Sequence, residues 1–257
     1  MRSAVYLLTC KMHSLRVLAC RAHEDTDRYR TELRVLVLGQ PHSGFPRLLG
    51  ACALPPHYAL HLGLEEGSAE QLIYEKSWRP SFGEALSIAR QMASALDHLH
   101  NGLRHLHRDV KPGNILVTRA SSGPIARLSD FGLAVREGQT AESSRPSGPS
   151  RGRTEAQVGT LPYLAPELLS RSAAGHSRAT DVYALGVTLN ELLTGIRPYS
   201  DSRREDPQCH TVLELGYGSQ ELAAAIAGWG LRPTIPAGVP LAVRQLIESC
   251  WCVLDLL

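Results

Sequence analysis

Four polar side chains flank a short predicted hairpin near the middle of the chain. An aspartate, a lysine and an asparagine precede a β-type run at Ile115–Val117, and a second aspartate follows another run at Ile125–Leu128. A Ser-Ser-Gly-Pro turn separates the two runs. In an antiparallel hairpin, the segment before the first strand and the segment after the second lie at the same end. We therefore expect four side chains to converge: Asp109, Lys111, Asn114 and Asp130.

This set of side chains could transfer a phosphoryl group from a nucleotide. The reaction needs a carboxylate to orient the attacking hydroxyl, oxygen ligands for Mg²⁺ and a cation near the transferred phosphate. Aspartate, asparagine and lysine supply all three. Catalysis by such a set would depend mainly on positioning and electrostatic stabilisation.

The same stretch resembles the eukaryotic protein kinase family. Residues 107–114 read H-R-D-V-K-P-G-N and residues 130–132 read D-F-G. The family's catalytic loop and metal-binding loop have these patterns. A lysine two positions after the aspartate is typical of the serine/threonine form of this loop.

The resemblance implies a role for each of the four residues. Asp109 would be the catalytic base, and Lys111 would contact the γ-phosphate. Asn114, which also belongs to the catalytic set, and Asp130 would bind Mg²⁺. ATP is the implied phosphate donor, and a serine or threonine of a protein is the implied acceptor.

Further motifs follow in the family's order, and the similarity runs from about Val5 to Trp251. They are the substrate-peptide loop at 159–163, Ala165-Pro166-Glu167 at the end of the activation segment, and the start of a buried central helix at 181–186. Alone, each has an ordinary explanation: Asp-Phe-Gly is usually a turn, and Asp181 could be a helix N-cap. Their shared order favours the kinase interpretation. Leu48-Leu49-Gly50 and Cys250-Trp251 are closest in style to the tyrosine-kinase-like group.

The match in the first residues lacks two expected features. The chain begins after the position of the family's glycine-rich hairpin, and Arg21 occupies the place of the ATP-binding lysine, with Glu32 as its helix partner. Arginine keeps the positive charge but has a wider, planar donor group. Lys11, one of only three lysines, is the competing candidate. At the other end, the chain stops before the arginine that pairs with Glu167 in the family, so we expect a kinase domain truncated at both ends.

By the resemblance, nucleotide contacts also come from residues around a hinge near 61–67. The expected nucleotide-binding set is Val5, Ala19, Arg21, Glu32, Leu62, Gly63, Leu116 and Asp130.

The expected fold is α+β, a protein-kinase-like arrangement of two lobes in one domain. Residues 1–64 would form a reduced, β-rich N-lobe of five strands or fewer, and residues 65–257 a mainly helical C-lobe. Apolar periodicity predicts the main elements. The strands are 5–9, 15–20 and 58–62, and the helices are 25–38, 82–101 with Ser81 as N-cap, 181–193 and 241–252.

Bulk composition limits the alternatives. The chain has 257 residues, of which 43% are hydrophobic and 20% charged, and a net charge of +2, so neither nucleic acid nor an anionic membrane is favoured. No run approaches the ~20 apolar residues of a membrane span. Six cysteines without Cys-x-x-Cys spacing suggest reduced thiols and a cytoplasmic protein rather than a zinc site.

Residues 136–157 read as a mobile activation-loop insert rich in Ser, Gly, Pro and Arg. In the family, the arginine before the catalytic aspartate, here Arg108, pairs with a phosphate on this segment. An upstream kinase acting on a serine or threonine of the loop could therefore order it.

The expected function is a protein serine/threonine kinase in signalling, dependent on Mg²⁺ and ATP. Arg21 and the absent glycine-rich hairpin favour one alternative, a weak or inactive pseudokinase acting as a binding module. A small-molecule phosphotransferase is less favoured, because those enzymes lack the stretch from Gly159 to Glu167.

Overall fold

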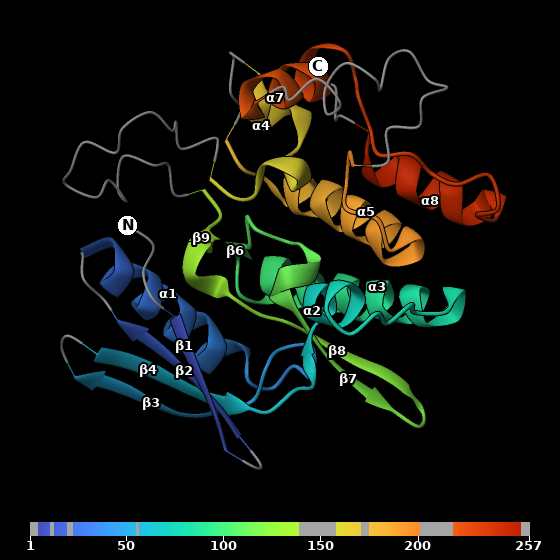
Figure 1. Ribbon diagram of the computed structural model, residues 1–257. Coiled ribbons are helices and arrows are strands. Elements are labelled where there is room, and N and C mark those ends of the chain that lie inside the picture. Colours follow the sequence, from blue (N-terminus) through green and yellow to red (C-terminus); the bar gives the residue numbers. More distant parts are fainter. Residues whose placement is uncertain are drawn as a thin grey trace.

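The structure is a computed structural model that describes residues 5–10, 13–19, 23–54, 57–138, 158–170, 175–200 and 218–252. Before Thr26 only the backbone is described. A sheet with one helix lies at one end of the molecule and a group of helices at the other (Figure 1). The α+β arrangement expected from the sequence is confirmed.

The first part is a four-stranded antiparallel sheet of order β1-β2-β4-β3. Its strands are β1 (Val5–Cys10), β2 (His13–Ala19), β3 (Leu48–Leu54) and β4 (His57–Gly63). Helix α1 (His23–Gly39) packs on it. The Tyr29 hydroxyl donates to the Cys52 carbonyl oxygen at 2.9 Å, and its ring lies 4.9 Å from the Tyr58 ring. The expected strands and helix are present, and β3 is an additional strand.

The segment that connects the sheet to the helical part is hydrogen-bonded to a hairpin. The hairpin consists of β7 (Ile115–Ala120) and β8 (Gly123–Leu128), and β5 (Gly67–Ser68) pairs with β7. Glu65 accepts hydrogen bonds from Arg127, at 2.6 Å, and from Thr118. Glu66 is bound by the Arg119 guanidinium. The loop before β3 is joined to the same hairpin, because the Leu128 amide donates to the Gly44 carbonyl oxygen at 2.8 Å.

Two helices follow the connection, each begun by a serine. Helices α2 (Ala69–Tyr74) and α3 (Phe82–Asp97) start at capping boxes in which Ser68 and Ser81 accept a backbone N–H three residues on. The expected long helix to residue 101 continues past Asp97 as a π-helical turn, His98–Gly102. The predicted cap at Ser81 is confirmed.

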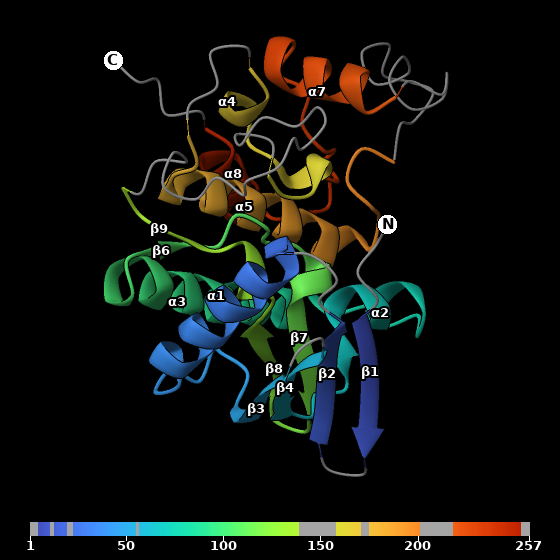
Figure 2. The same cartoon turned by 90° about the vertical axis from the view of Figure 1, so that its left-hand side faces the viewer.

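Helix α5 (Arg178–Thr194) is the centre of the helical part (Figure 2). Most of its residues are buried, as its nearly continuous apolar sequence predicts. Helix α8 (Leu241–Cys250) packs closely on it, since a Cβ at Gly186 would lie 2.6 Å from the Cys250 Cβ. The remaining helices are α4 (Pro166–Leu169) and α7 (Ser219–Gly228), and both views show them on the side of α5 that faces away from α3 (Figures 1 and 2).

Strands β6 (His105–Leu106) and β9 (Val135–Arg136) pair beside the hairpin. Of the expected mobile insert, residues 136–138 continue β9 into a turn, and residues 139–157 lie outside the described part of the chain. Among the described helices, none is long and apolar enough to span a membrane.

Candidate active site

The hairpin brings the two predicted loops together as its register requires. Ile115 pairs with Leu128, and the Ser129 amide and hydroxyl both donate to the Asn114 carbonyl oxygen at 2.9 Å. Asn114 and Asp130 line one cleft of about 560 Å³. This volume is in the range of small-molecule sites.

Asp109 is the centre of a compact hydrogen-bond network. Its Oδ2 accepts from Lys111 Nζ at 2.7 Å and from Asn114 Nδ2 at 3.0 Å. Its Oδ1 accepts from the Thr160 hydroxyl at 2.7 Å. Lys111 Nζ also donates to Thr160 Oγ1 at 2.6 Å. Three of the predicted site residues therefore share one carboxylate, and Thr160 is a fourth participant that the sequence placed only in a substrate loop.

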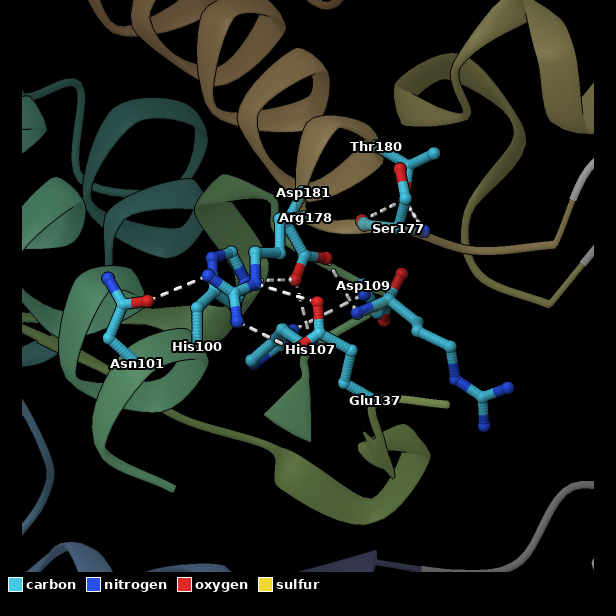
Figure 3. Close-up of polar contacts among 10 residues, drawn as sticks. His100, Asn101, His107, Asp109, Glu137, Ser177, Arg178, Thr180 and Asp181 are labelled. Atoms are coloured by element: carbon cyan, nitrogen blue, oxygen red, sulfur yellow. Dashed lines mark hydrogen bonds and ion pairs between the residues drawn. The ribbon is translucent and has the colours of Figure 1, made fainter. Parts of the chain in front are cut away.

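Helix α5 holds the catalytic loop through one buried carboxylate (Figure 3). Asp181 Oδ2 accepts from the His107 amide and Oδ1 from the Arg108 amide, both at 2.8 Å. His100 Nε2 donates to Oδ2 at 2.8 Å. Asp181 is not an N-cap, because Ser177 has that position and Asp181 lies one turn inside the helix.

The electrostatics of Asp181 follow from these bonds. Burial acts to raise the pKa of Asp181, but the hydrogen bond from His100, the nearby His107 ring and the two backbone N–H donors outweigh it. The pKa of Asp181 is therefore lowered from its ordinary value. An ionised carboxylate is the form that accepts all of these bonds.

His107 is held in one tautomer. Its Nδ1 accepts from the Asp109 amide at 3.2 Å, and its Nε2 donates to the Ser129 carbonyl oxygen at 3.0 Å. The ring therefore carries its proton on Nε2, since Nδ1 must keep its lone pair. The His107 ring therefore links the loop before β7 to Ser129, the residue that precedes Asp130.

An ion-pair cluster joins the strand after the D-F-G turn to α5. Arg178 donates to both oxygens of Glu137, at 2.7 and 2.6 Å, and to Asn101 Oδ1 at 2.7 Å (Figure 3). Two parallel donors to one carboxylate define the orientation of both groups. The start of the activation segment is thereby anchored to the helix that also anchors the catalytic loop.

The D-F-G turn has an uncommon backbone. Asp130 has φ 63° and ψ 64°, the left-handed region that aspartate tolerates better than most residues. Phe131 is fully buried, 4.8 Å from the Phe45 ring and 5.3 Å from the His107 ring. At Gly132 a Cβ would lie 3.4 Å from the Arg28 Cβ, so α1 packs directly on this turn.

The other predicted nucleotide-binding residues fall into three groups. Leu62 and Leu116 line the cleft. Gly63 is the last residue of β4, and its amide donates to the Arg47 carbonyl oxygen at 2.8 Å. Glu32 is buried on α1. Val5 and Ala19 are described by backbone pairing alone, in β1 and β2, and Arg21 and Lys11 lie outside the described residues.

Asn114 and Asp130 fit the ligand chemistry of Mg²⁺. The two hydrogen bonds from the Asn114 amide both use Nδ2, so Oδ1 is the atom that would bind a metal ion. Asp130 contributes a carboxylate to the same cleft. Within the described residues, no three His, Cys, Asp or Glu side chains form a metal cluster.

A buried glutamate lies beneath the cleft and was not predicted. Glu191 on α5 accepts from the Tyr74 hydroxyl at 2.7 Å and from the Tyr163 hydroxyl at 2.6 Å. Burial raises the pKa of Glu191 and of both tyrosines. This carboxylate therefore connects α2 with the segment that follows Thr160.

Similarity to known proteins identifies the family to which this fold belongs. The chain belongs to the protein kinase domain family, whose model matches residues 4–254. The expected kinase-like two-lobe fold is thereby confirmed at the level of the superfamily. The closer likeness to the tyrosine-kinase-like group remains a prediction.

Several curated proteins resemble the chain over most of its length. A protein kinase and PP2C-like domain-containing protein from Oryza sativa is 38% identical over 242 residues, and one from Arabidopsis thaliana is 38% identical over 239 residues. A probable LIM domain-containing serine/threonine-protein kinase from Dictyostelium discoideum is 30% identical over 234 residues. These alignments cover 89%, 89% and 90% of the chain but 36%, 35% and 31% of the relatives. The chain therefore spans about a third of the length of these relatives.

Proposed function

We propose that this chain is a protein serine/threonine kinase that transfers the γ-phosphoryl group of ATP to a serine or threonine hydroxyl of a protein, with Mg²⁺. The observation that carries the proposal is the Asp109 carboxylate, bonded to Lys111 and Asn114 beside a cleft of about 560 Å³ that Asp130 also lines.

Each residue has a step that its geometry supports. Asp109 accepts the proton of the attacking hydroxyl, and Lys111 places a positive charge beside it. Asn114 Oδ1 and the Asp130 carboxylate would hold Mg²⁺, whose charge would stabilise the phosphate oxygens. Thr160, bonded to both Asp109 and Lys111, keeps the carboxylate and the ammonium in register with the acceptor.

The remaining assignments belong to the same proposal. Residues 1–64 and 65–257 form the two lobes of one kinase domain, and Leu62, Gly63 and Leu116 contact the nucleotide. Val5, Ala19, Arg21 and Glu32 supply its other contacts. The name of the Dictyostelium relative supports serine or threonine as the acceptor. An upstream kinase would act on the 136–157 segment, with Arg108 as the partner of the new phosphate.

A second candidate is a pseudokinase that binds nucleotide or a partner protein without turnover. The arginine at position 21, where the family carries lysine, favours it. The complete set of Asp109, Asn114 and Asp130 favours the enzyme.

Phosphate incorporation from radiolabelled ATP into a mixed protein substrate tests the choice. We expect Asp109→Asn to lower the rate by about 10²- to 10⁴-fold, the usual contribution of a general base. Glu248→Gln, an exposed change on α8, is the matched control and should retain the wild-type rate. Equal background incorporation by wild type and Asp109→Asn would reject the enzyme in favour of the pseudokinase.

A further inference from the structure

A pair of histidine rings joins the loop between α1 and β3 to the end of α3. The rings of His42 and His98 are stacked, with their centres 4.8 Å apart and their planes at 10°. The Phe45 ring meets both of them edge to face, at 5.9 and 5.7 Å. Histidine is the side chain whose charge ordinarily changes between pH 5 and 8. The pair lies outside the candidate active site, and a proton taken up here would change the charge between two segments that pack together.

The hydrogen bonds of His42 require its neutral form. Its Nδ1 accepts from the Gly44 amide at 3.1 Å, so the ring proton is on Nε2, which donates to the Ser94 hydroxyl at 3.2 Å. A protonated ring carries a hydrogen on both nitrogens, and its Nδ1 would then face the Gly44 N–H as a second donor. Gly44 is buried, where an amide without an acceptor is unfavourable. Proton uptake by His42 is therefore incompatible with the observed turn.

The surroundings of His42 also oppose a positive charge. The titratable groups that act on it are His98, across the stack, and Asp97, both at the C-terminal end of α3. Burial and the His98 ring lower the pKa of His42, and the Asp97 carboxylate raises it by less. The pKa of His42 therefore lies below its ordinary value of about 6.5. In a turn released from α3 the ring would regain the ordinary value, so protons favour the released turn.

The turn at residues 42–45 supports the segment that carries the D-F-G sequence. The Gly44 carbonyl oxygen accepts from the amide of Leu128, the last residue of β8, at 2.8 Å. The Phe45 ring lies 4.8 Å from the Phe131 ring, and both side chains are buried. Release of the turn would therefore remove a backbone hydrogen bond before the D-F-G sequence and an aromatic contact within it.

We propose that His42 is a proton-controlled latch: its neutral ring holds the turn at residues 42–45 against α3 and the hairpin, and uptake of one proton releases the turn from the D-F-G segment. The contacts that form the latch are those of His42 with Gly44, Ser94 and His98. None of these residues belongs to the proposed nucleotide or metal site, so the latch is independent of the proposed kinase function. Its effect on that site rests on the proposed function.

Amide hydrogen exchange measures the release directly. Protection factors, which correct for the intrinsic pH dependence of exchange, are compared at pH 7.5 and 5.5. Since the released ring has a pKa of about 6.5, the population of the released turn should rise by up to about tenfold between these pH values. In wild type we expect the protection of the Gly44 and Leu128 amides to fall accordingly. The Ala126 amide of the same hairpin, bonded to Gln91 Oε1 at 2.9 Å, should keep its protection.

His42→Asn separates the proton from the turn. The asparagine side-chain oxygen can accept from the N–H two residues on, as Nδ1 does, but it does not titrate. Protection of the Gly44 amide should therefore remain in the variant and no longer depend on pH. His105→Gln is the matched control, at a histidine bonded to the Leu103 carbonyl oxygen, and should keep the wild-type pH dependence. Equal pH dependence in His42→Asn and wild type, or protection of Gly44 in wild type that does not change with pH, overturns the latch.

The two neighbours of His42 should move its titration midpoint in opposite directions. NMR of the histidine side chains gives the tautomer and the midpoint without reference to amide protection. His98→Phe keeps a stacked ring but removes a charge that opposes protonation, so the midpoint should rise. Asp97→Asn removes a charge that favours protonation, so the midpoint should fall. A His42 ring with its proton on Nδ1 at neutral pH, or an unchanged midpoint in both variants, contradicts the latch.

The effect on the proposed metal site has a separate test. A ligand that binds only the held form lowers the population of the released turn by a factor of one plus the ratio of ligand concentration to Kd. At pH 5.5, Mg²⁺ and ATP at about ten times the Kd should therefore raise the protection of the Gly44 amide about tenfold. Bound nucleotide with unchanged protection would show that the latch does not reach Asp130. Absence of binding would reject the proposed nucleotide site, whereas the pH dependence of exchange would still decide the latch.

Discussion

At the scale of single residues, the proposed chemistry would depend on how the Asp109 carboxylate is oriented. Each of its oxygens accepts from a different segment: Oδ2 from Lys111 and Asn114, and Oδ1 from Thr160. Lys111 also bonds to Thr160, which closes a ring of three polar groups. Such a ring restrains the carboxylate, as the proposed general base requires, since it would have to meet the acceptor hydroxyl at hydrogen-bond distance.

The Thr160 hydroxyl is the part of this ring that a substitution can remove without changing charge. We expect Thr160→Val to lower kcat about tenfold or more, because Asp109 Oδ1 and Lys111 lose a shared partner, with little change in KM for ATP. Thr160→Ser keeps the hydroxyl and should remain within about twofold of wild type. Steady-state kinetics of both variants test this, and a loss as large in Thr160→Ser as in Thr160→Val would contradict a role for the hydroxyl.

Burial of His176 should make the stability of the fold depend on pH. Burial and the nearby Arg108 guanidinium lower the pKa of His176 to about 4, against an opposing effect of Asp181. The unfolded chain, with an ordinary histidine pKa of about 6.5, therefore binds a proton before the folded chain does. The folded state loses stability as the pH falls from about 6.5 towards 4.

We expect His176→Gln to weaken that loss, because glutamine cannot take up the proton. Urea unfolding of wild type and variant at several pH values between 7 and 4.5 gives the difference in slope. The lowered pKa of His42 contributes to both proteins and cancels in the comparison. Parallel stability curves for the two proteins would show that His176 makes no contribution.

The proximity of Asp109, Lys111 and Asn114 was predictable from the sequence, whereas their distant partners were not. Asp109, Lys111 and Asn114 lie within six consecutive positions, and the hairpin places Asp130 beside them. Thr160 is separated from Asp109 by 51 positions and Tyr74 from Glu191 by 117. Nothing local in the sequence indicates such contacts, because they arise only when segments distant in the sequence pack together.

At the scale of elements, the first turn of α5 positions the catalytic loop. Asp181 binds two consecutive amides of the loop, so the helix determines where the backbone before Asp109 lies. These are charge-assisted hydrogen bonds in a buried site, where an unpaired amide would lower the free energy of unfolding.

We expect Asp181→Asn to lower the free energy of unfolding by about 2–3 kcal/mol, because an amide accepts on one atom only and leaves one loop N–H unpaired. Since the pKa of Asp181 is lowered in the fold, the wild-type advantage should be present above pH about 4 and should disappear as the pH falls below it. Urea unfolding measures the difference.

Hydrogen exchange locates the effect of Asp181→Asn. The amides of His107 and Arg108 should exchange faster in the variant. The control is Ser177→Ala at the N-cap of the same helix, which should cost about 1 kcal/mol without this local change. Unchanged exchange at both amides in Asp181→Asn would contradict the anchoring role.

Long, strongly patterned elements were predictable and short or weakly patterned ones were not. Helix α3 begins at the predicted cap, but its last turn becomes π-helical, which a 3.6-residue period does not reveal. Strand β3 was missed because its middle is Gly-Ala-Cys-Ala, mostly exposed and without alternation. Helix α7 was missed because its Ala-rich sequence has no clear apolar stripe.

At the scale of the whole molecule, the cleft opens between the sheet part and the helical part. Leu62 reaches it from β4, and Leu116 and Asp130 from the hairpin and the turn after it. A ligand that binds here contacts both parts, so it should stabilise the molecule as a unit.

We expect Mg²⁺ and ATP together to raise the melting temperature by roughly 5–10 °C when the ligand concentration is about 100 times its dissociation constant. Binding at that concentration adds ~2.7 kcal/mol to the free energy of unfolding. Removal of Mg²⁺ with EDTA should abolish most of the shift, as should Asp130→Asn. Differential scanning fluorimetry measures it. A shift with ATP that is indifferent to Mg²⁺ and to Asp130→Asn would contradict the proposed metal site, and the assay does not depend on turnover.

The attachments of the hairpin also restrict how the two parts can move. The side chains of Glu65 and Glu66 bind arginines of β8 and β7, respectively. Because β4 ends at Gly63, Leu64 lies between the sheet and this attachment to the hairpin. Among the described residues, the other backbone attachment is the Gly44 carbonyl on Leu128. A displacement of the sheet relative to the helices should therefore be smallest near Leu64 and Gly44, and it would also have to shift α1 on the D-F-G turn against which it packs.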